Sequence, residues 1–233
     1  RPRDLDAIGG LGLVLMWYRT IRGACSRNLA ICFGQTCTPL YKWVKFGRKI
    51  LLSFLINDSE ADIKNSTDEE KQLIRNQLDL FKDCNAPCIV FAEVSGSIQG
   101  DPNRKLSTRP QMDNDEWSAF CKKMSEMAKF LEGEGMPLAY HHHMGTVVET
   151  QEDTVRLLEN TDESVKLTLD TGHMLFAQGN SKKILEDFSS RIIHIHCKDI
   201  RKDVLDNSLK NDLSFREAFL EGAFTVPGDG CID

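Results

Sequence analysis

Hydrophobic and polar positions follow two alternating periods along most of this chain, from about residue 57 onward. Stretches with apolar residues at helical spacing alternate with short apolar runs, and capping residues precede several of the helical stretches. The pattern predicts strands that begin near residues 88, 137, 165 and 192. It predicts helices from about 68 to 83, from Asp113 or Asn114 to Gly133, from Thr150 to about Asn160, from Asn180 or Ser181 to about Phe188, and from Ser214 to Leu220.

Alternating helices and strands indicate parallel βαβ units and an α/β fold. A doubly wound sheet and a closed (β/α)8 barrel both satisfy this order of elements. No glycine-rich phosphate turn follows a predicted strand, which disfavours a dinucleotide-binding sheet. Polar residues end several successive strands, and this favours a TIM barrel, because barrel sites are built at the carboxyl ends of the strands.

Composition narrows the function classes. The chain has 233 residues, of which 41% are hydrophobic and 27% charged, as in soluble globular proteins. Its net charge of −6, without a basic stripe with interleaved aromatics outside the first segment, argues against a nucleic-acid partner. The eight cysteines include no CxxC pair, so we expect reduced thiols and a cytoplasmic protein.

Residues 1–56 differ from the remainder in charge. They hold nine Lys or Arg against two acids, a balance of +7, so the remainder must carry −13. The apolar runs at 11–18 and 50–56 are too short to span a bilayer, and we expect no membrane partner. We interpret 1–56 as an atypical segment, for which a frame or gene-model error is a better explanation than an export role, and 57–233 as the barrel domain.

Candidate chemistry centres on the stretch PLAYHHHMG at 137–145. All six histidines lie between His141 and His196, and three of them are consecutive at the end of an apolar run. Because side chains alternate along a strand, His141 and His143 are expected on one face and His142 on the other.

Two later strands repeat this arrangement. In VKLTLD, Thr168 and Asp170 share the polar face, and in RIIHIHCKD, His194 and His196 do so. Imidazole nitrogens and a carboxylate oxygen that converge from neighbouring strand ends are what a divalent metal needs. The sequence therefore predicts a metal site at this edge of the sheet.

At these residues the sequence resembles the inosose dehydratases, 2-keto-myo-inositol dehydratases within the xylose-isomerase-like TIM barrel superfamily. The matching stretches are GSIQGD at 96–101, MPLAYHHHMGTVVE at 136–149, LDTGHMLFAQG at 169–179, HIHCKD at 194–199 and FTVPGDG at 224–230. The resemblance implies a barrel that binds manganese or cobalt and dehydrates 2-keto-myo-inositol, a cyclic polyol ketone, in inositol catabolism. Glutathione has also been associated with the family's activity.

The resemblance also implies roles for individual residues. Asp170 and His196 correspond to two metal ligands, and His141 to the third, at a position where many relatives have glutamate. His143 resembles the position of the catalytic base in related dehydratases.

Candidates for proton donation to the leaving hydroxyl are His173, Lys198 and Glu93. His173 and Glu93 are also candidates for substrate binding. For Lys198 an ion pair with a carboxylate is an equally good explanation, and for Glu93 a solvated position at the rim of the site.

Two departures from the family pattern bear on the fold. The family's last ligand, a glutamate, is expected shortly after VPGDG, and the sequence given stops at Asp233. Residues 1–56 do not resemble the family's first two βα units. We therefore expect a barrel that is incomplete at both ends, and we keep two alternatives to dehydration: a metal-dependent sugar isomerase or epimerase, and a non-catalytic barrel fragment.

Overall fold

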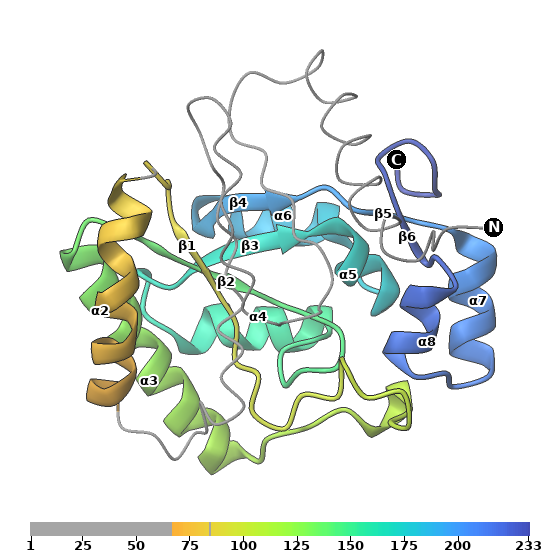
Figure 1. Cartoon of the computed structure of the whole chain (residues 1–233), viewed down its shortest axis with the longest axis horizontal. Helices are drawn as coiled ribbons and strands as arrows, with labels where there is room; N and C mark the ends of the chain where they lie inside the picture. The colour runs from red at the N-terminus through yellow and green to blue at the C-terminus, as the bar shows by residue number, and fades with distance from the viewer. Residues whose placement is uncertain (1–66, 84) are drawn as a thin grey trace, which may run out of the picture.

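The computed structural model of the protein describes residues 67–83 and 85–233 (Figure 1). The expectations for residues 1–56 lie outside the described residues. The helices are α2 (Thr67–Asp83), α3 (Asn114–Gly133), α4 (Gln151–Asn160), α5 (Thr171–Phe176), α6 (Ser181–Phe188), α7 (Lys202–Lys210) and α8 (Phe215–Leu220). The strands are β1 (Ile89–Phe91), β2 (Leu138–His141), β3 (Lys166–Asp170), β4 (Ile192–His196), β5 (Asp199–Ile200) and β6 (Phe224–Thr225).

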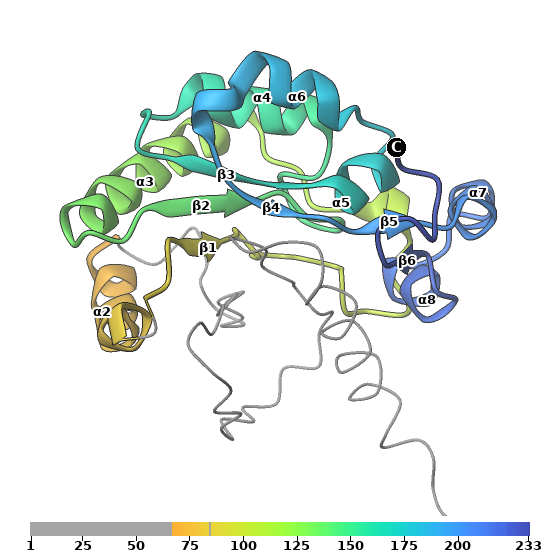
Figure 2. The same cartoon turned by 90° about the horizontal axis from the view of Figure 1, so that it is seen from above.

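Strands β1 to β4 form a parallel sheet in the order in which they follow along the chain. Each of them pairs in parallel with the next, and β3 is the strand that pairs with both β2 and β4. Figure 2 shows the sheet as a curved layer with α3, α4 and α6 along one face. Because the four strands run in the same direction, the residues that follow them gather at one edge.

The helix-covered face of the sheet holds the apolar side of each strand. Leu138 and Tyr140 of β2 are buried in a core with residues of α2 and α3. Leu167 and Leu169 of β3 pack in a second core with residues of α4, α5 and α6. Thr168 and Asp170 of β3, and Ala139 and His141 of β2, belong to neither core, and as the alternate strand positions they point to the other side of the sheet. The predicted alternation of side chains is therefore confirmed for both strands.

Strand β4 alternates in the same way, but its apolar side is exposed, whereas the apolar sides of β2 and β3 are buried. His194 and His196 are buried, whereas Ile193 and Ile195 are 39% and 36% exposed. The polar side of β4 is thus the inner side, as it is in β2 and β3.

Local sequence signals explain where several helices begin. Asp113, Thr150 and Ser214 each cap a helix through a reciprocal capping box, in which the residue three positions later bonds back to the cap. The buried face of α3 consists of Trp117, Phe120, Cys121, Met124, Met127, Ala128 and Leu131.

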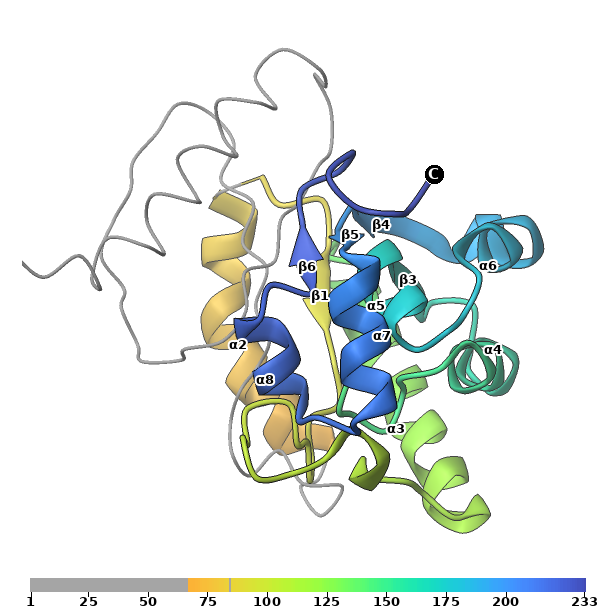
Figure 3. The ribbon, with the colours of Figure 1, turned by 90° about the vertical axis from the view of Figure 1, so that its right-hand side faces the viewer.

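Four short elements in the last third of the chain were not predicted. They are the helices α5 and α7 and the strands β5 and β6, which pair with each other. Figure 3 shows α7 and α8 side by side, with β5 and β6 close to them. The buried face between them includes Phe176, Ile200, Leu205, Phe215 and Ala223.

Asp199 holds the loop that follows β6. Its carboxylate accepts four main-chain N–H groups, from Ile200 at 2.8 Å, Gly228 at 3.0 Å, Gly230 at 3.0 Å and Ile232 at 2.9 Å. These bonds lower the pKa of Asp199 although burial alone would raise it. A charged acceptor satisfies several backbone donors of one loop at once, which fixes the path of that loop.

None of the described helices has a long enough apolar stretch to cross a membrane.

Candidate metal and catalytic site

The candidate site lies where β2, β3 and β4 end. His141 is the last residue of β2, Asp170 the last of β3, and His196 the last of β4. The register sets Asp170 directly beside His196 and His141 beside Thr168. Parallel pairing therefore brings together three side chains that are separated by up to 55 positions in the sequence.

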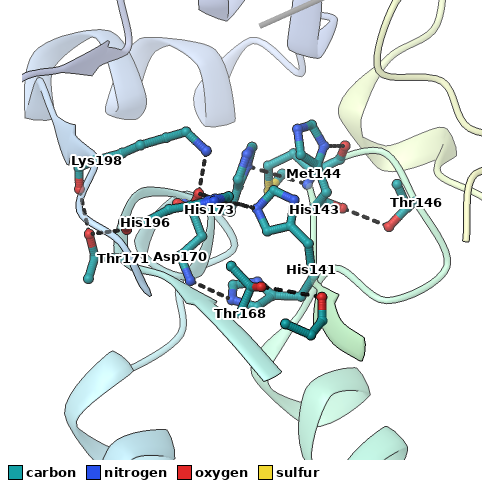
Figure 4. Close-up of polar contacts among 12 residues, drawn as sticks. His141, His143, Met144, Thr146, Thr168, Asp170, Thr171, His173, His196 and Lys198 are labelled. Atoms are coloured by element: carbon teal, nitrogen blue, oxygen red, sulfur yellow. Dashed lines mark hydrogen bonds and ion pairs between the residues drawn. The ribbon is translucent and has the colours of Figure 1, made fainter. Parts of the chain in front are cut away.

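One carboxylate oxygen is the centre of the cluster (Figure 4). Asp170 Oδ2 lies 3.2 Å from His141 Nε2 and 3.1 Å from His196 Nδ1, and these two nitrogens lie 3.3 Å apart. The Lys198 ammonium also bonds this oxygen. Asp170 and His141 are fully buried and His196 is 1% exposed. The three predicted metal ligands thus meet at one buried point.

His173 approaches the same carboxylate from the following helix. Asp170 is the N-cap of α5, and its Oδ1 accepts the backbone N–H of His173 at 2.9 Å. The ligand atoms of His141, Asp170 and His173 all lie within 4.8 Å of one another. Sequence reasoning gave His173 a proton-transfer role, and the geometry makes it a further candidate ligand.

The protonation states of this cluster fit a divalent cation. Burial lowers the pKa of His141 and His173 well below the usual value, so both rings are neutral and keep a lone pair. Burial alone would raise the pKa of Asp170, but the Lys198 charge and the neighbouring imidazoles hold it well below its usual range. Neutral imidazoles and an ionised carboxylate are the forms that bind metal. The residues present therefore fit a divalent metal.

His143 lies next to this cluster with a defined tautomer. Its Nδ1 lies 2.7 Å from the carbonyl oxygen of Met144, and since a carbonyl can only accept, Nδ1 carries the proton. The lone pair is then on Nε2. Burial lowers the pKa of His143 to about 3, so the ring is neutral at neutral pH.

His173 has the opposite arrangement. Its Nδ1 lies 3.5 Å from the backbone N–H of Met144, a long hydrogen bond in which the ring accepts and the proton is left on Nε2. The rings of His143 and His173 lie 3.8 Å apart between centroids. Phe215 is 5.5 Å from His143, and Phe224 is 5.0 Å from His173. The two imidazoles thus form a close pair beside an aromatic wall.

The remaining predicted site residues, Lys198 and Glu93, differ in whether they contact the cluster around Asp170. Lys198 bonds Asp170, which agrees with the expectation that a carboxylate pairs with it, and its ammonium lies 5.9 Å from the Phe224 ring centroid. Glu93 follows β1 at the same edge of the sheet, and its Oε1 accepts the backbone N–H of Ser95 at 2.7 Å. Burial raises the pKa of Glu93. Glu93 has no hydrogen bond to the cluster among the contacts of the described residues.

Two residues outside the predicted catalytic, substrate-binding and metal-binding set support the site. His142 Nε2 accepts the backbone N–H of Asp170 at 3.2 Å, which ties the end of β2 to the end of β3. Glu149 accepts the backbone N–H of Gly145 at 2.6 Å within the histidine loop. Glu149 stands in the stretch MPLAYHHHMGTVVE, and this membership was the one signal that could have drawn attention to it.

Comparison with known proteins adds to this geometry. A family model described as a xylose isomerase-like TIM barrel matches residues 51–233. The chain belongs to this family. The predicted fold class is thereby confirmed, and within the described residues the parallel sheet and its helices are the barrel's βα units.

Curated relatives confirm the resemblance to inosose dehydratases. An inosose dehydratase of Clostridium beijerinckii is 40% identical over 166 residues, which are 70% of this chain and 55% of the relative. An inosose dehydratase of Bacillus licheniformis is 36% identical over 172 residues, 73% of this chain and 57% of the relative. The rhizopine catabolism protein MocC of Rhizobium meliloti is 41% identical over 170 residues, which are 73% of this chain and 52% of the relative. The chain spans about half the length of these relatives.

Solved structures agree on the fold. A xylose isomerase-like TIM barrel/4-hydroxyphenylpyruvate dioxygenase fusion protein has a TM-score of 0.51 at 13% identity, over 71% of this chain and 23% of that one. The IolI protein, whose crystal structure has a bound zinc atom, has a TM-score of 0.50 at 18% identity. The match covers 71% of this chain and 53% of the IolI chain. At these identities the likeness bears on the fold alone.

Proposed function

We propose that this protein is a metal-dependent hydro-lyase that dehydrates 2-keto-myo-inositol (scyllo-inosose) to a trihydroxycyclohexane-1,2-dione in inositol catabolism. The observation that carries the proposal is the meeting of His141, Asp170 and His196 at one buried point, in a chain similar to inosose dehydratases. The substrate is a small cyclic polyol ketone. The cysteine usage and the metabolic substrate also support a cytoplasmic protein.

We assign His141, Asp170 and His196 as metal ligands and leave His173, whose Nδ1 accepts the Met144 N–H, outside the ligand set. The cation is manganese or cobalt by the family resemblance, and glutathione is a candidate additional requirement. When bound, the cation supplies positive charge that makes the C–H next to the substrate ketone more acidic.

His143 is the proposed base. Met144 O holds its Nδ1–H, so Nε2 presents the lone pair that accepts the proton from the substrate carbon. The ring is neutral at neutral pH because it is buried beside Phe215 and Lys198. Its fixed tautomer removes the need to reorient before proton transfer.

His173 is the proposed acid for the second half of the reaction. Its Nε2–H can protonate the β-hydroxyl as the C–O bond breaks, so that water leaves and a carbon–carbon double bond remains. Lys198 carries further N–H donors at the same place and is the second candidate for this role. Glu93, whose carboxyl lies at the same edge, is proposed to bind substrate hydroxyls.

The mass of the product tests this proposal. The full chain is incubated with manganese or cobalt and 2-keto-myo-inositol, and the products are separated and weighed by mass spectrometry. We expect a product that has lost one water, and no such product from the Asp170→Asn variant, which keeps the size of the side chain but not its charge.

Two other outcomes would overturn the proposal in different ways. A product of unchanged mass would identify a sugar isomerase or epimerase. Metal bound in one equivalent without any turnover would identify a non-catalytic fragment of the barrel.

A further inference from the structure

The loop that joins β2 to α4 is buried along its whole length except for Thr150, the cap of α4. Residues 141–149 are all buried, although a loop with buried backbone must satisfy its own polar groups. The His143 N–H donates to Val148 O at 3.0 Å, and the Thr146 hydroxyl donates to His143 O at 2.9 Å. Hydrogen bonds within the loop therefore satisfy these buried polar groups and hold the loop beside the candidate site.

One peptide group of this loop joins a histidine to an acid. The carbonyl of Met144 and the N–H of Gly145 belong to the same planar peptide, and in a trans peptide they point in opposite directions. The carbonyl accepts the Nδ1–H of His143 at 2.7 Å. The N–H donates to Glu149 Oε2 at 2.6 Å. Rotating this peptide would break both bonds together.

Neighbouring contacts show that Glu149 is itself held in place. Its Oε1 lies 3.7 Å from Arg109 Nε, and Arg109 Nη1 lies 3.0 Å from Asp153 Oδ2. Gly145 has a φ of +78°, and a Cβ at this position would lie 2.9 Å from the backbone nitrogen of Gln99. The Gly145 carbonyl in turn accepts the Ile98 N–H at 3.0 Å, so this part of the loop is held on both sides of Gly145.

We propose that Glu149 is a positioning residue for proton transfer: by accepting the Gly145 N–H it fixes the Met144 peptide, and with it the tautomers of His143 and His173. His173 is included because its Nδ1 accepts the backbone N–H of Met144, the residue whose carbonyl belongs to the Met144–Gly145 peptide. The assignment of proton-transfer roles to the two rings rests on the proposed function, whereas their tautomers do not depend on it.

Two substitutions of Glu149 separate the effect of side-chain length from the effect of side-chain charge. Glu149→Gln keeps an acceptor oxygen at the same distance along the side chain but loses the ion pair with Arg109. Glu149→Asp keeps the charge but is one carbon shorter, so that its carboxylate falls short of the Gly145 N–H. If Glu149 acts through the hydrogen bond, Gln resembles the wild type and Asp does not; if it only balances Arg109, the order is reversed.

Histidine tautomers give a readout that a merely structural role would not move. The full chain is labelled with ¹⁵N in histidine, freed of metal with a chelator, and studied by two-bond ¹H–¹⁵N correlation NMR. We expect His143 protonated at Nδ1 and His173 at Nε2 in the wild type and in Glu149→Gln, and mixed tautomers at His143 in Glu149→Asp. Asp153→Asn weakens the Arg109 pairing and keeps a side-chain oxygen that can accept the Glu149 and Thr150 N–H groups. It is the matched control and should keep the wild-type tautomers.

Kinetics connect the tautomers to turnover. In the manganese-loaded chain, Glu149→Asp should lower kcat about tenfold, the effect of one lost hydrogen bond, with a much smaller change in KM. Wild-type tautomers in Glu149→Asp, or mixed tautomers in Asp153→Asn, would overturn the inference. If the wild type fails to dehydrate the inosose, the proposed function fails, while the NMR comparison still decides the role of Glu149.

Discussion

At the scale of single residues, the site depends on how burial and contacts set protonation. Asp170 stays ionised in a buried position because Lys198 and two imidazoles surround it. His141 stays neutral there because burial outweighs the attraction of the carboxylate. A metal could displace the bonds within this set without first having to remove a proton from an imidazolium.

Substitution of His143 tests its role as the base. His143→Gln keeps a neutral polar side chain but cannot accept a proton at neutral pH, so we expect kcat to fall by about 10²- to 10⁴-fold. Metal content should be unchanged, because no hydrogen bond joins His143 to Asp170 among the described residues. His194→Gln, the same change on the inner side of β4, serves as the control. Equal losses of kcat in the two variants would refute the assignment.

Buried histidines should make stability depend on pH. Burial lowers the pKa of His142 to about 4 and that of His143 to about 3, whereas both titrate near 6.5 when the chain is unfolded. Below about pH 6.5 the unfolded chain therefore binds protons that the folded chain does not. Their contribution is complete above this pH and is lost as the pH falls toward the folded values.

Urea unfolding with a chelator present measures this effect. Between pH 7.5 and pH 5 the free energy of unfolding should fall by about 2 kcal/mol for each of the two histidines. His142→Gln, whose amide oxygen can still accept the Asp170 N–H, should remove about half of the contribution of this pair. A free energy that is the same at both pH values would contradict the burial argument.

At the scale of elements, sequence could predict what local signals determine. The capping boxes at Asp113, Thr150 and Ser214 are visible as residue pairs three positions apart, and the corresponding helices are confirmed. Strands β5 and β6 were missed because each has only two residues and their pairing joins Asp199 to Thr225 across the chain. The loop held by Asp199 depends on equally distant hydrogen bonds, which no local pattern reports.

Close packing between α5 and β6 gives a test at this scale. A Cβ on Gly172 would lie 2.6 Å from Lys198 Cβ and 3.0 Å from the Phe224 ring, so Gly172→Ala must displace at least one of these neighbours. We expect a loss of about 1–3 kcal/mol in the free energy of unfolding, measured with urea. Gly133→Ala, at the end of α3, meets nothing within 4 Å and should not destabilise the chain. Equal stabilities of the two variants would show that the contact at α5 is not tight.

At the scale of the whole molecule, the parallel sheet explains why the site lies where it does. Alternating periods and polar strand ends were enough to predict the TIM barrel fold and the edge at which the site lies. They were not enough to rank His173 against His196 as a ligand. Both rings come near Asp170, one through the turn into α5 and the other through β4, and only the folded geometry reveals this.

Metal content is the most direct test of the central claim, that the buried His/Asp cluster holds a divalent cation. The full chain and its Asp170→Asn variant are dialysed against manganese, freed of excess and analysed by elemental mass spectrometry, with folding checked by circular dichroism. The account predicts one manganese per wild-type chain and none in the folded variant. Equal manganese in the two proteins, or none in either, would contradict it.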